Sequence, residues 1–257
     1  MKQKYQNNDY KAQKKPSIAL FFMAILLCAC LIYNYNNLKL GLRINSYDKI
    51  IAGYEQVKKE QGIQKLLDIN ENFVAWLTCD GANISIPVVK TQTKDDENFY
   101  LDHDFEKYSN PLGIPYQKHN CNIDTTTNTV FVGHSAYTQT WIGNQTTQAV
   151  FGNLQNYLSK NLNLNVSVQT LQTTYNYKII SAFSFDSENY DDDDIIAYTT
   201  TNITTQSQFN NFYNNIIQSS AIDTGVTATF GDKFLTLFTC SANNLQNRIV
   251  IVAKLIV

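Results

Sequence analysis

The sequence predicts a mostly β domain, closed into a barrel, that follows an N-terminal apolar segment and a short helical region. Three observations support this fold class. Short apolar runs with the two-residue period of strands recur from Phe73 to the C-terminus. Residues 73–257 show no internal repeat and have the length of a single domain. Many strands within one domain of this length favour closure into a barrel.

The first segment is an apolar run that is long enough to cross a membrane once. Residues 17–38 contain no charged side chain, and a helix needs about 17–25 residues to span the hydrocarbon core. Five lysines and one acidic residue precede the run, so the positive-inside rule places residues 1–16 in the cytoplasm. We therefore expect a single transmembrane anchor, with all later residues on the extracytoplasmic side.

Two alternatives to an uncleaved anchor stay open. The end of the run, Cys28-Ala29-Cys30, is a poor version of the small-residue site at which signal peptides are cleaved. Residues 27–30 also resemble a lipoprotein box, which would place a lipid on Cys30. We favour the uncleaved anchor because the apolar run is longer than that of a signal peptide.

Charge and cysteine usage limit the partners of the extracytoplasmic part. Acidic residues outnumber basic ones beyond residue 16, which argues against nucleic acid as a partner. Cys79, Cys121 and Cys240 show no metal-ligand spacing, so zinc is not expected. Cys79 and Cys121 are expected to be separate thiols, although a disulfide between them stays open outside the cell. The acidic run Asp191–Asp194 is expected to be a solvated loop rather than a calcium site.

The period of the apolar residues changes along the chain. Residues 39–72 have a three-to-four spacing, which predicts a helical linker with one or two amphipathic helices. The barrel follows at residues 73–257. Its strands are expected at Val74–Leu77, Ile84–Val88, Thr129–Val132, Val166–Leu171, Tyr175–Phe185, Phe234–Thr239 and Arg248–Val257. Two inserted helices, each with one apolar face, are expected at Thr147–Leu158 and Gln206–Ser219.

The sharpest local feature is a strand that ends in a cysteine. Residues 236–240 read Thr-Leu-Phe-Thr-Cys, and Arg248 opens the next strand. The strand period places Phe238 and Cys240 on one face, and Arg248 lies on the polar face of the following strand. The thiolate is the attacking form of cysteine, and a neighbouring cation lowers the pKa of a thiol. Arg248 is therefore a candidate to activate Cys240 or to hold a developing oxyanion.

A histidine at the end of another strand is the candidate base. His134 follows Val130-Phe131-Val132-Gly133, and imidazole has a pKa suited to proton transfer near neutral pH. Taken alone, Cys240 is also consistent with a small buried hydrophobe, and His134 with a hydrogen-bonded loop residue. His103 and His119 lie in polar contexts and are expected to be structural.

Together these residues resemble the signature of the sortase family. Thr-Leu-Phe-Thr-Cys at 236–240 with Arg248 eight positions on, and Val-Gly-His at 132–134, are similar to the family pattern T-L-x-T-C…R with its upstream Gly-His. The region Trp76–Val89 and the run Tyr100-Leu101-Asp102-His103-Asp104-Phe105 resemble the class B members. The resemblance covers residues 46–257.

The resemblance implies a fold, a reaction and three catalytic residues. The family fold is an eight-stranded β-barrel. The family reaction cuts a C-terminal sorting signal, holds the protein as a thioester and passes it to an amine on a cell-wall precursor or another protein. By resemblance, Cys240 is the nucleophile, His134 is the general acid/base and Arg248 stabilises the substrate carbonyl. No cofactor is implied.

We expect an extended sorting peptide to bind in a groove beside Cys240, with Leu101, Phe238 and Thr239 as contacts. Phe238 departs from the many family members that carry a small residue there, and residues 241–247 lack an acid that some members have. Within the family, anchoring of surface proteins is favoured over polymerisation of pilins because it is the commoner class B role. A hydrolytic cysteine protease and a domain that only binds sorting peptides are the rival functions.

Overall fold

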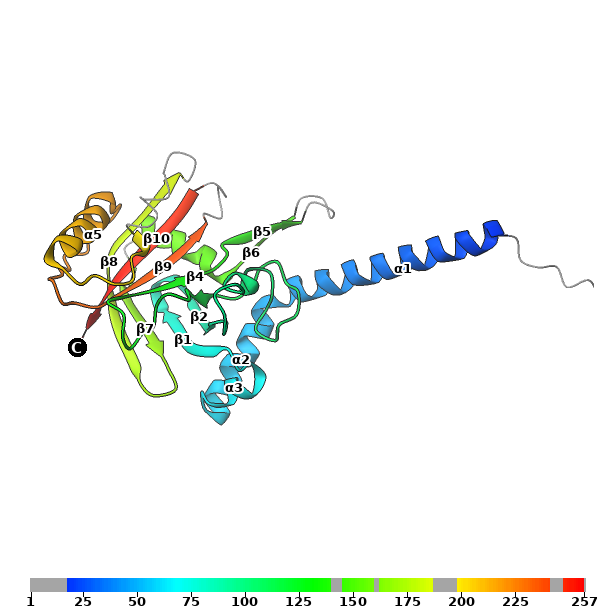
Figure 1. The fold of residues 1–257 in the computed structure, drawn as a ribbon, viewed down its shortest axis with the longest axis horizontal. Coiled ribbons are helices and arrows are strands. Elements are labelled where there is room, and N and C mark those ends of the chain that lie inside the picture. Colours follow the sequence, from blue (N-terminus) through cyan, green and yellow to red (C-terminus); the bar gives the residue numbers. More distant parts are fainter. Residues whose placement is uncertain (1–17, 140–144, 160–161, 187–197, 241–246, 257) are drawn as a thin grey trace, which may run out of the picture. The chain divides into compact units, whose positions relative to one another are not determined.

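A computed structural model describes residues 18–139, 145–159, 162–186, 198–240 and 247–256 of the chain (Figure 1). The chain divides into two compact units, residues 1–42 and residues 43–257, which are considered in turn. The acidic run Asp191–Asp194 lies outside the described residues, so the expectation of a solvated loop there stays a prediction.

The described part of the first unit is one helix. Helix α1 covers Ile18–Asn45, and its last three residues belong to the second unit. An 18-residue window within Leu20–Asn45 has a mean hydropathy of 1.5, and this window is not buried against other parts of the protein. Among the described helices, it is the one that is long and apolar enough to cross a membrane. The boundaries drawn from the sequence, an anchor over residues 17–38 included, stay predictions.

Two helices lead from α1 to the barrel, as the spacing of the apolar residues predicts. Helix α2 covers Tyr47–Gln61, and α3 covers Lys65–Ile69. The buried side chains of α2 are Tyr47, Ile51 and Tyr54, which follow each other at three-to-four-residue intervals. One face of α2 therefore packs on the domain, while its charged residues other than Lys58 are exposed, and Lys58 Nζ lies 4.5 Å from the centre of the Trp76 ring.

Arg43, the first residue of the second unit, forms a partly buried ion pair within that unit. Arg43 Nη2 lies 2.5 Å from Asp104 Oδ2, and the Arg43 guanidinium lies 4.0 Å from the centre of the Tyr108 ring. Asp104 is 3% exposed, and the backbone N–H groups of Glu106 and Tyr108 also donate to it. The neighbouring Ile44 is 1% exposed. Residues 43 and 44 are thus part of the folded barrel unit.

Eight strands close into a barrel in which distant parts of the sequence become neighbours (Figure 1). Around the barrel the order is β1 (Phe73–Cys79), β2 (Ile84–Val89), β3 (Tyr116–Gln117), β4 (Asn128–Val132), β9 (Phe234–Cys240), β10 (Asn247–Ile256), β8 (Thr174–Asp186) and β7 (Asn165–Gln169). Strand β7 pairs with β1 and completes the ring. The predicted closed eight-stranded barrel is confirmed.

Shorter elements lie in the connections between the strands. After β4 come a hairpin, β5 (Ala136–Gln139) and β6 (Gln145–Gln148), and the 3₁₀ helix η3 (Val150–Leu158). The turns η1 (Asp80–Ala82) and η2 (Phe99–Leu101) flank β2, and helix α5 (Gln206–Ser219) precedes β9.

The predicted helix over Thr147–Leu158 is wrong in its first turn and in its type. Gln145–Gln148 pair with β5 as a strand, so the helix begins at Val150 and is a 3₁₀ helix. The β-branched side chains of Thr146 and Thr147 favour a strand in this place. Strands β3, β5 and β6 were not expected, because β3 has two residues and the hairpin is built mainly from Gln and Thr.

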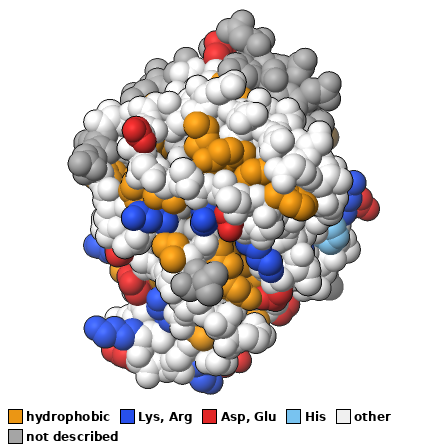
Figure 2. Space-filling view, turned by 90° about the vertical axis from the view of Figure 1, so that its left-hand side faces the viewer, with side chains coloured by type: hydrophobic (Ala, Val, Ile, Leu, Met, Phe, Trp, Pro, Cys, Tyr) orange, Lys and Arg blue, Asp and Glu red, His pale blue; other side chains and the backbone are white. Residues whose placement is uncertain are grey.

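Helix α5 has the predicted bounds and covers an aromatic face of the barrel. Thr205 caps its N-terminus in a capping box with Gln208. Its buried side chains join a cluster with residues of the three strands β8, β9 and β10. The cluster contains Ile180, Phe183, Phe185, Tyr198, Ile203, Phe209, Phe212, Ile216, Ala228, Phe234, Val250 and Val252. Figure 2 shows the α5 side of the molecule, where small hydrophobic patches interrupt a mostly uncharged surface.

Candidate active site

Three neighbouring strands bring the candidate catalytic residues to one end of the barrel. Strand β9 lies between β4 and β10. Strands β4 and β9 run parallel and end on the same side, and β10 begins there because it runs antiparallel to β9. His134 follows the end of β4, Cys240 ends β9, and Arg248 is the second residue of β10. The topology thus gathers three residues that lie far apart in the sequence.

The ladder between β9 and β10 sets Arg248 directly opposite Cys240. Residues directly opposite in an antiparallel pair have Cβ atoms about 4.5–5.5 Å apart, on one face of the sheet. Arg248 is half-buried. The structure describes the backbone of Cys240, while its side chain lies outside the described part of the chain. The register brings the two residues together, and their catalytic roles stay predictions.

His134 reaches this end of the barrel through a glycine. The N–H of Gly133 donates to the carbonyl oxygen of Phe238 at 3.2 Å, which extends the β4–β9 ladder one residue beyond β4. A Cβ on Gly133 would lie 3.0 Å from Cδ2 of Phe151 and 3.2 Å from its Cγ. The missing side chain therefore lets η3 pack closely against the segment that carries His134.

The imidazole of His134 is held by residues in and just after η2. The backbone of Leu101 makes a hydrogen bond with the ring, and the Asp102 carboxylate lies near enough to favour the protonated ring. Burial acts against both and is the larger effect, so the pKa of His134 is lowered from its usual value. The ring is therefore mainly neutral at pH 7 and able to accept a proton.

Asp102 also contacts a second histidine. Asp102 Oδ1 lies 2.6 Å from His103 Nδ1, and the His103 ring stacks on Phe99 with centroids 3.9 Å apart. His103 Nδ1 is also 2.9 Å from the Phe99 carbonyl oxygen. These contacts fit the structural role expected for His103.

The three residues predicted to contact substrate differ in exposure. Leu101 and Phe238 are half-buried, whereas Thr239 is 1% exposed and lies on the other face of β9 from Cys240. Oγ1 of Thr239 has no hydrogen-bond partner among the described residues. Burial leaves only the backbone of Thr239 for a substrate contact, and all three roles stay predictions.

Cys79 and Cys121 are buried free thiols, in line with the expectation of separate thiols. Burial raises the pKa of each above that of an ordinary cysteine. Both thiols are therefore protonated at neutral pH and shielded from solvent, which makes them unreactive. Neither residue is a candidate nucleophile.

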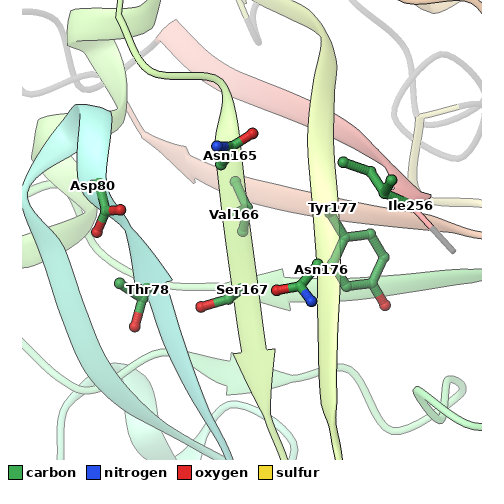
Figure 3. A pocket seen from close by; sticks show the side chains of 8 residues that line it. All are labelled: Thr78, Asp80, Asn165, Val166, Ser167, Asn176, Tyr177 and Ile256. Atoms are coloured by element: carbon green, nitrogen blue, oxygen red, sulfur yellow. The ribbon is translucent and has the colours of Figure 1, made fainter.

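A cavity of about 440 Å³ lies elsewhere on the barrel, between β1, η1, β7, β8 and β10 (Figure 3). Its lining residues are Thr78, Asp80, Asn165, Val166, Ser167, Asn176, Tyr177 and Ile256. None of them is a candidate site residue. Among the described residues, no group of His, Cys, Asp and Glu is arranged to hold a metal ion.

Sequence reasoning missed the neighbours that orient His134. It gave Asp102 no role and considered Leu101 only as a substrate contact, a role that stays a prediction, while both residues act on the His134 ring. The spacing of residues in the sequence does not reveal that η2 lies beside the end of β4, because the two segments are separated in the chain and meet only in the folded barrel. The available signal was the family-like run from Tyr100 to Phe105.

Comparisons with known proteins agree with this geometry. A family model described as a sortase domain matches residues 77–256. Sortase B of Staphylococcus aureus (strain NCTC 8325 / PS 47) is 24% identical over 226 residues, which are 87% of this chain and 84% of the relative. Sortase B of Listeria monocytogenes serovar 1/2a (strain ATCC BAA-679 / EGD-e) is 23% identical over 200 residues, which are 76% and 74% of the two chains.

Solved structures show the same fold. A Staphylococcus aureus sortase B–substrate complex has a TM-score of 0.66 at 22% identity, covering 84% of this chain and 98% of that chain. The X-ray structure of Clostridium perfringens sortase B has a TM-score of 0.61 at 23% identity, covering 76% of this chain and 99% of that one.

Proposed function

This chain belongs to the sortase family and is a cysteine transpeptidase whose matched relatives are sortase B enzymes, and from this premise we propose its substrates and the roles of its residues. The donor is a surface protein with a C-terminal sorting signal. The acceptor is an amine of a cell-wall precursor. Cys240, His134 and Arg248 carry out the exchange.

The first half of the reaction forms a thioester. The sulfur of Cys240 attacks the carbonyl carbon of the scissile amide, and His134 takes the thiol proton. The C–N bond then breaks, and His134 gives this proton to the leaving nitrogen. Arg248 donates N–H groups to the carbonyl oxygen while that oxygen carries negative charge.

The second half transfers the acyl group to the acceptor. The amine attacks the thioester carbonyl and loses a proton to His134. The C–S bond breaks, and the Cys240 thiolate takes the proton back. One amide replaces another, so the exchange balances without an oxidant, a reductant or a nucleotide.

One observation supports this assignment above the others. The ladder places Arg248 opposite Cys240, and the parallel ladder on the other side of β9 leads to His134. The proposed nucleophile, a cation and a neutral imidazole therefore converge where β4 and β9 end and β10 begins. Cys79 and Cys121 are instead buried thiols whose pKa is raised by burial.

The location of the enzyme follows from its family and from its first helix. Sortases are extracytoplasmic, and α1 is apolar enough to be a membrane anchor. We propose a single-pass topology in which the lysines of residues 1–16 stay in the cytoplasm. The barrel then works beside the membrane, where cell-wall precursors and exported donors meet.

No specific observation favours the rivals, namely pilin polymerisation, plain hydrolysis and peptide binding without catalysis. The direct test incubates the full chain in detergent with sorting-type peptides and an amine, and identifies products by mass. The expected product is the N-terminal part of the peptide joined to the amine, with a thioester to Cys240 trapped when the amine is omitted. A product that carries only water would contradict the transfer, and an absence of any cleavage would contradict catalysis.

A further inference from the structure

The catalytic face of the barrel continues into an aromatic surface. Arg248 pairs with Cys240 on one side and with Phe185 of β8 on the other. Two positions along, Val250 pairs with Phe238 of β9 on one side and with a β8 residue on the other. Residues two positions apart share a face of the sheet, so both rows lie on the face that carries Cys240 and Arg248.

The rings on this face are in contact with one another. The centroids of Phe185 and Phe238 are 6.4 Å apart, and those of Phe185 and Tyr198 are 5.7 Å apart. Both distances lie in the range of favourable aromatic pairs. Phe185 is 5% exposed and belongs to the cluster beneath α5, and Phe238 packs against that cluster while remaining half-buried. The Phe238 ring is therefore packed against this cluster on one side and keeps part of its surface exposed.

The position of Phe238 matches the reach of an extended peptide. Two residues of a strand span about 6.6–6.8 Å, which is also the span of two residues of an extended substrate. A donor peptide that runs along β9 with its scissile carbonyl at Cys240 passes the Phe238 ring with a residue near the cut bond. An aromatic ring favours an apolar side chain there, because a polar one would lose hydrogen bonds to water without gaining a partner.

We propose that Phe238, held in place by Phe185, is a specificity-determining residue that selects donor peptides with an apolar side chain within two residues of the scissile bond. The proposal rests on the proposed function, because it concerns the donor of that same reaction. It gives this chain a donor preference set by the aromatic ring of Phe238.

The test uses the full chain in detergent and pairs of sorting-type peptides that differ only in leucine or asparagine at one position. Each position within two residues of the scissile bond is varied in turn. At one of them we expect kcat/KM for the leucine peptide to exceed that for the asparagine peptide by roughly tenfold or more, as apolar pockets discriminate. Phe238→Ser is expected to reduce this ratio to below about threefold by slowing the leucine peptide.

A matched control separates the proposed role of Phe238 from the general effect of losing an aromatic ring. Phe230 is 44% exposed and also contacts the cluster, with its ring centroid 6.3 Å from that of Phe209. Phe230→Ser should leave the leucine-to-asparagine ratio at the wild-type value. Phe238→Tyr keeps the ring and adds a hydroxyl, so it should fold normally and lower the ratio by about threefold.

The outcomes distinguish this specificity proposal from the proposed function on which it rests. An unchanged leucine-to-asparagine ratio in folded Phe238→Ser overturns the proposal that Phe238 determines specificity. If that variant does not fold, an unchanged ratio in Phe238→Tyr overturns the proposal instead. A wild-type ratio near one at every position also overturns it. A wild-type chain that cleaves no peptide contradicts the proposed function itself.

Discussion

Strands β1 and β9 each have seven residues, begin with phenylalanine and end in Thr-Cys. Their terminal cysteines nevertheless have different surroundings. Cys79 at the end of β1 lies opposite Ile84 and Val166 and is completely buried. Cys240 at the end of β9 lies opposite Arg248.

The neighbours of each strand decide what its cysteine can do. Burial raises the pKa of Cys79, and the adjacent Asp80 adds to the effect because a negative charge opposes the thiolate. The ladder sets the cationic Arg248 opposite Cys240, and we expect this cation to favour the thiolate there. Local sequence alone therefore does not determine the surroundings of a cysteine, since β1 and β9 share an ending and differ in their partners across the ladder.

The largest expected effect on activity comes from replacing single cysteines. Cys240→Ala should abolish cleavage and transfer, with a loss of at least about 10³-fold in kcat, because no other thiol can form the acyl intermediate. Cys79→Ala and Cys121→Ala should keep near wild-type activity. Products are identified by mass. Turnover by Cys240→Ala would contradict the proposal that Cys240, and not Cys79, is the nucleophile.

The next effect tests the cation that distinguishes the two strands. Arg248→Lys should fold with an unchanged Tm but lose at least about tenfold in kcat/KM, or about 1.4 kcal/mol. The guanidinium is a rigid fork of donors, and loss of one oxyanion donor costs about 10²–10³ in turnover. Lys254→Arg, further along the same strand, serves as the control for charge. Near wild-type activity in folded Arg248→Lys would show that any cation suffices.

A smaller effect concerns the histidine, which has no counterpart beside β1. The Asp102 carboxylate raises the pKa of His134, so Asp102→Asn should lower it further. Activity that needs a neutral imidazole is lost as pH falls through this pKa, so the acidic limb of kcat/KM should move to lower pH by up to about one unit.

Salt and a second acid provide the controls for that shift. Asp102 is 73% exposed at its side chain, so the shift should shrink in high salt, where exposed charges are screened. Asp95→Asn changes an exposed acid before η2 and should leave the limb in place. A limb that moves upward in Asp102→Asn would contradict the assigned contact.

The smallest effect on activity is expected at the opposite end of β1. Phe73 packs on Phe105, and the neighbouring Asp104 is paired with Arg43. A chain that begins at Asn45 should therefore be less stable than one that begins at Arg43, because it leaves a buried carboxylate without its partner. The expected loss in the free energy of unfolding is about 1–3 kcal/mol. Each kcal/mol lowers Tm by roughly 2–4 °C in a domain of this size.

Both truncated chains should cleave short peptides at similar rates below their melting temperatures. Equal Tm values would show that Arg43 contributes nothing to the fold. Loss of activity in the chain that begins at Arg43 would mean that residues before it are part of the catalytic unit.

Periodic segments were predictable from the sequence, and short or polar ones were not. Strands β8, β9 and β10 and helix α5 were predicted because their apolar residues repeat with the period of the element they form. The hairpin β5–β6 escaped prediction because its strands are polar. Its pairing depends on the folded position of the chain after His134.

The same limit applies to the site. The motif around Cys240 and Arg248 pointed to their chemistry, and the register agrees with that choice. The contact between η2 and His134 and the pairing of Phe185 with Arg248 depend on barrel closure. Contacts between segments without a common period cannot be read from spacing alone.

The parallel pairing of β4 with β9 also determines when the enzyme becomes active. The hydroxyl of Thr236 in β9 donates a hydrogen bond to Oδ1 of Asn128 in β4, although the two residues are 108 positions apart in the sequence. Contacts of such long range form slowly, because a large loop must close before the strands gain any stability. A chain exported from its N-terminus delivers β9 almost last. We therefore expect Cys240 to meet His134 and Arg248 only when the barrel is nearly complete, so that a half-exported chain has no assembled site with which to attack other exported proteins.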